Sequence, residues 1–63
     1  MAFLVDYAPW TLRAPEVVEA VDVARAGPHL EFTDWRLVVG RPRAVVALRV
    51  PAQEVMRVRE VAG

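Results

Sequence analysis

Few residues of this sequence are of the types that carry nucleophilic catalysis. The chain contains no serine and no cysteine, and its hydroxyl side chains are Tyr7, Thr11 and Thr33. An activated nucleophile needs an adjacent base, and the only imidazole is that of His29. Because His29 follows a Gly-Pro pair and precedes an apolar run, we expect it to be an exposed loop histidine. The sequence therefore predicts no catalytic residue.

Residues that hold metals and cofactors are equally scarce. Zinc and copper sites need three or four ligands, most of them imidazoles or thiolates, and this chain has one histidine and no thiol. Glu19 and Asp22 would be neighbours on a helix, but paired acids act only across a cleft, which so short a chain can scarcely enclose. Gly27, Gly40 and Gly63 are isolated, so there is no glycine-rich phosphate loop. We expect no metal, no cofactor and no enzyme activity.

Aromatic and arginine side chains remain as candidates for a binding surface. Exposed aromatics interleaved with arginines are typical of sheets that bind nucleic acid, because the rings stack on bases while guanidinium groups neutralise phosphates. A small core also needs aromatics, and we assign Phe3 and Phe32 to it. The predicted binding surface comprises Trp10, Trp35, Arg36, Arg41, Arg43, Arg49, Arg57 and Arg59.

The net charge is zero, but the charges are unevenly distributed along the chain. Residues 1–35 contain two arginines and six acidic residues, whereas residues 36–63 contain six arginines and two acidic residues. One interpretation is that the two halves are neighbours in a sheet and their charges pair across strands. The other is an arginine-bearing face that contacts an acidic protein or a nucleic acid.

Five prolines divide the chain into short apolar segments, which favours several short elements over a few long ones. Residues 2–8 are typical of a first strand, with Phe3, Val5 and Tyr7 on one face.

Residues 16–26 fit two structures. As a helix, the segment would start after Pro15 and end at Gly27, with its valines on one face. As a strand, its alternation of apolar residues is interrupted at Glu19. Four valines in eleven residues favour the strand slightly.

Residues 30–39 predict a strand with a defect. Phe32 lies on one face of this strand, whereas Trp35 and Leu37 lie on the other. One extra residue at positions 33–34, in a bulge or tight turn, would keep both halves of the strand facing the core.

Residues 40–43 predict a turn, because glycine at its start can adopt positive φ. Residues 44–51 follow as the most regular strand, with Val46, Leu48 and Val50 facing one way. The two strands and the turn form a predicted hairpin.

Residues 52–62 fit either a helix or a strand that follows a short helical turn. The strand, which we prefer, would bury Met56 and Val58 and expose Arg57 and Arg59. This succession of long hairpin, proline-containing turn and final strand is similar to the end of small SH3-like β-barrels. The resemblance covers about the last thirty residues and implies a β-barrel arrangement there.

We therefore predict a single all-β domain over residues 1–63, built as a small five-stranded meander or open barrel. The alternative is an α+β fold of β-α-β-β order with a C-terminal strand or helix. A chain of 63 residues buries little surface and has no cysteine for a disulfide, yet 56% of its residues are hydrophobic. These features together predict association with a second copy.

The function predicted first is a non-enzymatic interaction or adaptor module that self-associates into a homo-oligomer. The alternative is a nucleic-acid-binding module that uses the arginine-bearing hairpin and the C-terminal strand. A pI near 6.5 counts against that alternative, because such domains usually exceed about 9. The first residues lack a secretory signal pattern, and no apolar run is long enough to cross a membrane, so we expect a cytoplasmic protein.

Overall fold

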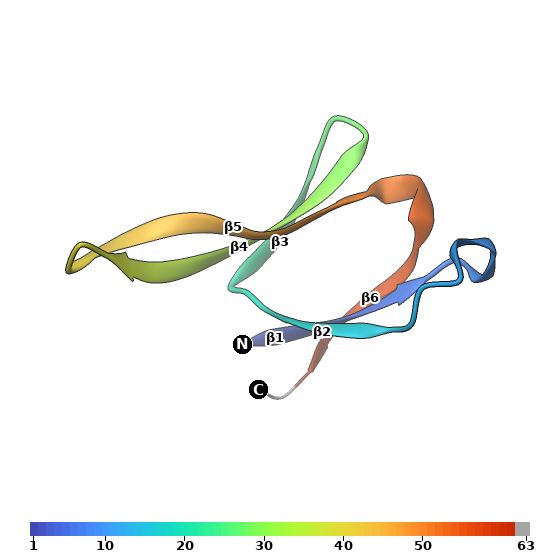
Figure 1. The fold of residues 1–63 in the computed structure, drawn as a ribbon, viewed down its shortest axis with the longest axis horizontal. Helices are drawn as coiled ribbons and strands as arrows, with labels where there is room; N and C mark the ends of the chain where they lie inside the picture. The colour runs from blue at the N-terminus through green and yellow to red at the C-terminus, as the bar shows by residue number, and fades with distance from the viewer. Residues whose placement is uncertain (62–63) are drawn as a thin grey trace.

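The computed structural model describes residues 1–61, and the regular structure in this part of the chain is nearly all β (Figure 1). The strands are β1 (Ala2–Tyr7), β2 (Glu16–Glu19), β3 (Asp22–Ala26), β4 (His29–Val38), β5 (Arg41–Pro51) and β6 (Val55–Val61). Single turns of 3-10 helix, η1 (Pro9–Thr11) and η2 (Ala52–Glu54), follow β1 and β5. The all-β class is confirmed. Residues 62 and 63, at the end of the predicted tail, lie outside the described part.

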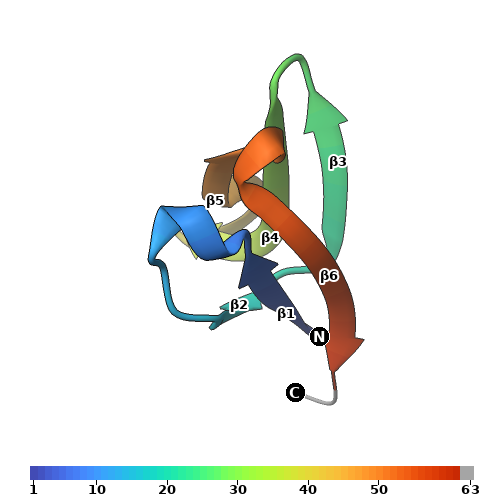
Figure 2. The same cartoon turned by 90° about the vertical axis from the view of Figure 1, so that its right-hand side faces the viewer.

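The strands form two antiparallel sheets that pack against each other. One sheet has the order β2-β1-β6 and the other the order β3-β4-β5. Figure 2 shows the end-on view, in which η2 carries the chain from β5 in one sheet to β6 in the other. The predicted succession of hairpin, helical turn and last strand is present. The strands of residues 1–61 form two three-stranded sheets rather than one five-stranded meander, and they do not close into a barrel.

The described chain has six strands rather than the predicted five, because residues 16–26 form two strands in different sheets. The Ala20 N–H donates to the Met1 carbonyl at 3.1 Å, and the Val21 N–H donates to the Thr33 carbonyl at 2.8 Å. Neighbouring residues thus bond to opposite sheets. Ala20 is completely buried at this crossover, where a larger side chain would overfill the core.

The core lies between the two sheets. The predicted face of β1 is confirmed, since Phe3, Val5 and Tyr7 are all buried. The rings of Phe3 and Phe32 meet from opposite sheets, with centroids 5.9 Å apart and planes inclined by 60°. The buried cluster comprises Phe3, Val5, Tyr7, Val18, Ala20, Phe32 and Val50.

The predicted C-terminal strand is confirmed as β6, but its buried residues differ from the prediction. Asp6 pairs with Arg57 and Tyr7 pairs with Val55, so Met56 is an extra residue in β6. Such a bulge residue has no partner opposite it, and Met56 is exposed while Val55 packs on the core. The prediction of a buried Met56 was wrong because the sequence alternation does not reveal this bulge.

Two aromatic residues of β4 provide a test of where the core ends. Phe32 has none of its surface exposed, whereas Trp35, three residues later, is 60% exposed. We expect Phe32→Ala to lower the free energy of unfolding by about 3–5 kcal/mol, because it opens a cavity. Trp35→Ala should change it by no more than about 0.5 kcal/mol. Urea denaturation of dilute protein, followed by circular dichroism, measures both. Equal destabilisation by the two variants would contradict this placement of the core.

Candidate binding surface

The β4–β5 hairpin extends well beyond the rest of the molecule, as its left-hand end in Figure 1 shows. We call residues 33–46 the arm. The strand β3 pairs with β4 only from Thr33 back to His29, so the outer part of the arm is a ribbon of two strands. The molecule measures 41 Å along its longest axis and 16 Å along its shortest.

Cross-strand register divides the arm into two faces of different chemistry, because residues paired directly across an antiparallel ladder point to the same side. Trp35 pairs with Ala44 and Leu37 with Pro42, whereas Arg36 pairs with Arg43. The apolar face consists of Thr33, Trp35, Leu37, Pro42, Ala44 and Val46. The arginine face consists of Asp34, Arg36, Val38, Arg41, Arg43 and Val45.

The apolar face is open to solvent. Trp35 is 60% exposed and Leu37 is 76% exposed, and Val46 beside them is also exposed. The prediction that both halves of this strand face the core was wrong. The strand β4 has no extra residue, so after Phe32 its apolar side chains continue on the opposite side of the ribbon.

The predicted irregularity lies at the expected place but in the other strand. Phe32 pairs with Leu48 and Thr33 pairs with Val46, which leaves Ala47 as the extra residue of β5. This bulge changes the phase of β5, so Val46 joins the apolar face while Leu48 and Val50 stay with the core. The predicted common face for Val46, Leu48 and Val50 was therefore wrong at Val46.

The tip of the arm is a two-residue turn at Val39 and Gly40. The predicted turn over residues 40–43 was wrong beyond Gly40, because residues 41–43 already pair with β4 as the start of β5. Val39 has φ of 52° and Gly40 has φ of 73°, the left-handed values of a type I′ hairpin turn. Glycine adopts such values freely, but a β-branched valine is strained there. Val39 is also 95% exposed, so burial of its side chain does not offset this strain.

The other predicted site residues lie away from the arm. Trp10 is exposed in η1, at the opposite end of the molecule (Figure 1). Arg57 and Arg59 are in β6, which belongs to the other sheet from Arg49 in β5. The composite arginine surface of hairpin and C-terminal strand is therefore not assembled as one face.

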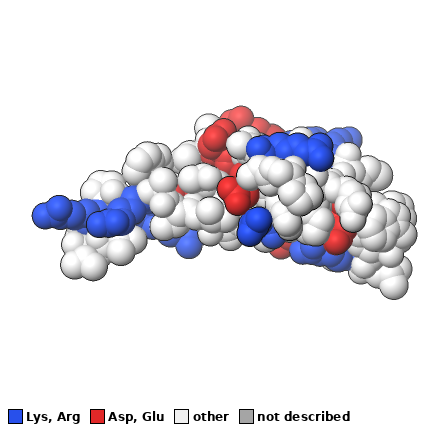
Figure 3. All heavy atoms as spheres, turned by 90° about the horizontal axis from the view of Figure 1, so that it is seen from above, with Lys and Arg blue, Asp and Glu red and all other residues white. Residues whose placement is uncertain are grey.

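Charge pairing across strands accounts for part of the uneven charge distribution. The Arg49 Nε lies 3.4 Å from the Glu31 Oε2, and the Arg57 Nε lies 3.3 Å from the Asp6 Oδ2. The ion pair of Arg36 is longer, with its Nε 3.7 Å from the Asp34 Oδ2. Figure 3 shows arginines at the tip of the arm and mixed charges on the body.

Four arginines remain outside this pairing. Within residues 1–61, no carboxylate lies within 4.0 Å of Arg25, Arg41, Arg43 or Arg59. Two of the four, Arg41 and Arg43, are on the arginine face of the arm.

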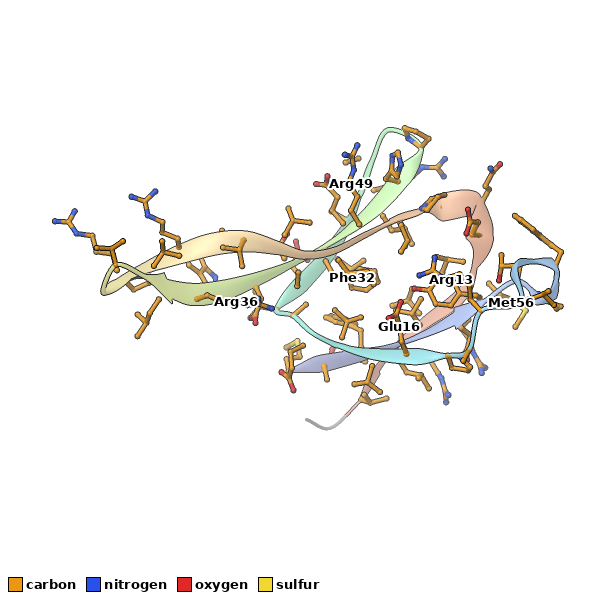
Figure 4. All side chains as sticks on the ribbon, viewed as in Figure 1. Arg13, Glu16, Phe32, Arg36, Arg49 and Met56 are labelled. Carbon is orange, nitrogen blue, oxygen red and sulfur yellow. The ribbon has the colours of Figure 1, made fainter. Side chains whose placement is uncertain are left out.

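A polar cluster that the sequence did not indicate closes the end of the sandwich near η1 (Figure 4). The Tyr7 hydroxyl donates to the Glu16 carboxylate, and the Arg13 Nη2 donates to the Tyr7 oxygen at 3.2 Å. The Arg13 guanidinium stacks 3.9 Å from the Tyr7 ring centroid and lies 3.7 Å from Glu54 in η2. Burial, reinforced by Glu16, raises the pKa of Tyr7 to about 12. A phenol that holds its proton so firmly does not act as a base near neutral pH. The contacts of the cluster instead connect the segment after η1 with β1, β2 and η2.

His29 also differs from its prediction. It is the first residue of β4 rather than a loop residue, and it is half-buried. Its Nδ1 lies 3.5 Å from the Arg49 Nη2, which is a peripheral contact on the outer side of the sheet.

Residues 1–61 enclose no detectable pocket and contain no group of three or more histidine or acidic side chains arranged to hold a metal. No helix in this part of the chain is long and apolar enough to cross a membrane. Comparison with protein-family models, with curated proteins and with solved structures found no match for the chain.

The single tyrosine gives a direct test of the polar cluster. The pKa of Tyr7 is raised from 10.0 to about 12, so the folded state binds this proton more tightly than the unfolded chain does. The resulting stabilisation is complete below pH 10 and is lost as the pH rises toward 12. Absorbance at the tyrosinate band should titrate near pH 12 in native protein and near pH 10 in urea. A native midpoint near 10 would show that the cluster does not form.

The strained turn gives a second test. Asparagine tolerates left-handed φ and favours type I′ turns before glycine. Val39→Asn should stabilise the tip by about 1 kcal/mol and slow hydrogen exchange of the Arg41 amide about fivefold. Gly40→Ala, placed at φ of 73°, should accelerate that exchange. Unchanged exchange in both variants, measured by NMR, would contradict the assigned turn.

Proposed function

We propose that this chain is a small non-enzymatic interaction module that self-associates through the apolar face of its arm. The observation that carries the proposal is the row of Trp35, Leu37 and Val46, exposed together on a ribbon that no other part of residues 1–61 covers. Contiguous apolar patches on small soluble domains mark interaction sites. An isolated two-stranded ribbon is at best marginally stable in water, so covering this face also stabilises the arm.

The occupant we propose is the same face of a second copy. Two apolar faces stacked about a two-fold axis form a self-complementary interface that closes as a dimer. If the arms run in opposite directions, the tip of each lies over the base of the other. Arg36, Arg41 and Arg43 lie on the other face of the ribbon, so stacking the apolar faces does not bring these like charges of the two arms together.

Stacking of faces is favoured over the addition of a strand to the outer edge of β5. In a type I′ turn the Val38 and Arg41 pair is hydrogen-bonded, so the backbone groups of the next pair, Leu37 and Pro42, point outward. Pro42 has no N–H to donate along that outer edge of β5. A proline at this position hinders the addition of a further strand.

The size of the face predicts a weak dimer. Tryptophan buries roughly 150–250 Å² when fully covered, and the smaller neighbours add less. The total falls near or below the lower bound of about 1,200 Å² for stable complexes. We therefore expect a dissociation constant in the micromolar range or weaker, with monomer and dimer in rapid exchange.

Sedimentation velocity from about 5 µM to about 500 µM tests the proposal. The wild-type chain should change from monomer to dimer over this range. The variant Trp35→Gln/Leu37→Gln should stay monomeric, because it replaces two apolar side chains of the interface. The matched control Leu12→Gln/Met56→Gln removes exposed apolar side chains at the other end of the molecule and should dimerise like wild type.

Three results would overturn the proposal. The first is a wild-type chain that remains monomeric at the highest concentration while its circular dichroism shows a folded β protein. The second is equal loss of association in both double variants. The third is growth beyond the dimer, which a closed two-fold arrangement does not allow.

A further inference from the structure

The opposite face of the arm has a charge arrangement that the fold does not neutralise. Arg36 and Arg43 are direct cross-strand partners, and Arg41 lies two residues beyond Arg43 on the same face. Like charges placed directly opposite each other destabilise a strand pair. Arg36 has Asp34 at 3.7 Å, but within the described residues neither Arg41 nor Arg43 has a carboxylate within 4.0 Å.

The sequence of the arm contains nothing else that offsets these charges. Residues 35–46 include three arginines and no acidic residue. The remaining side chains of the arginine face beyond Asp34 are Val38 and Val45, which leave the guanidinium groups unobstructed. The outer arm is therefore a local concentration of positive charge on a chain whose net charge is zero (Figure 3).

We infer that the arginine face of the arm binds the phosphate backbone of double-stranded nucleic acid. Guanidinium groups match phosphate oxygens with two parallel hydrogen bonds. A duplex carries one negative charge per roughly 1.7 Å of its axis, so three closely spaced cations find phosphates at any sequence. An exposed ribbon face without a pocket suits an extended polyanion that lies along it.

A duplex is favoured over an acidic protein as the ligand, because the arginines can bind it at any position along its length. Carboxylates on a folded protein lie at fixed places and would have to match Arg36, Arg41 and Arg43 one by one. Phosphates repeat along the whole length of a duplex, so the same face binds in many registers. Backbone binding of this kind is independent of base sequence.

This inference does not rest on self-association, because the two faces of the arm are on opposite sides of the ribbon. A monomer presents one arginine face. A dimer stacked through its apolar faces would present two, directed away from each other, and would bridge two duplexes.

Fluorescence polarisation with a labelled DNA duplex of about 20 base pairs and mixed sequence tests the inference. Release of counterions from three phosphate contacts predicts a slope near −2.7 in a plot of log affinity against log salt concentration. Affinity should thus fall about 40-fold between about 50 and 200 mM salt. Titrating the Trp35→Gln/Leu37→Gln variant in parallel separates binding from self-association, and this variant should retain both affinity and slope.

Two charge-matched variants locate the site. Arg41→Gln/Arg43→Gln should lose at least about tenfold in affinity at low salt, and its slope should fall toward about −0.9. Arg57→Gln/Arg59→Gln removes the same charge from β6 and should bind within about twofold of wild type. The Arg41→Gln/Arg43→Gln variant should still dimerise, since its apolar face is intact.

Three results would overturn the inference. The first is no change in polarisation at about 50 mM salt with protein up to about 100 µM. The second is an equal loss of affinity in the two arginine variants, which would mean that the arm has no special role. The third is displacement of the duplex by polyglutamate at equal charge concentration, which would identify a site for acidic protein instead.

Discussion

The length of the β4–β5 hairpin relative to the other sheet is the constraint on which the rest of the structure depends. Its strands have 10 and 11 residues, whereas the strands of the facing sheet have 4 to 7. A short sheet covers only the base of a long hairpin, and the core therefore ends near Phe32 and Leu48. Beyond that point the ribbon has no sheet to pack against, and both of its faces meet solvent.

The bulge at Ala47 gives this unsupported ribbon its two distinct faces. Without an extra residue in β5, Val46 would lie on the side of the arginines and Arg43 on the side of Trp35. With it, apolar residues from both strands gather on one side and arginines on the other. A single inserted residue thus produces an amphipathic ribbon, in which the apolar surface that we propose binds a second copy is separated from the basic surface that we propose binds phosphate.

Much of this architecture can be predicted from the sequence, and the predictions that were wrong have specific physical causes. The strand character of residues 2–8, the hairpin turn at Gly40 and the burial of Phe3 and Phe32 depend on local propensity and alternation, which a single sequence displays. The crossover at Ala20 is not visible in this way, because it depends on hydrogen bonds to Met1 and Thr33, far apart in the chain. The alternation of apolar residues predicts the change of phase after Phe32. It does not predict which strand contains the extra residue, or that the apolar side chains of the arm face solvent rather than the core. The cluster of Tyr7, Arg13, Glu16 and Glu54 forms only where three segments of the chain meet in space. No residue spacing in the sequence therefore predicts it.

The central claim is that the apolar face of the arm becomes buried when copies associate, and Trp35 itself reports on this. In the variant Trp10→Phe the only tryptophan is Trp35, which is largely exposed in the monomer. Its fluorescence emission should shift to shorter wavelength as protein concentration rises, with the same midpoint as the dimerisation seen by sedimentation. The companion variant Trp35→Phe, which retains Trp10, should show no shift. Association without a shift of Trp35 emission, or with a shift of Trp10 emission instead, would contradict the claim.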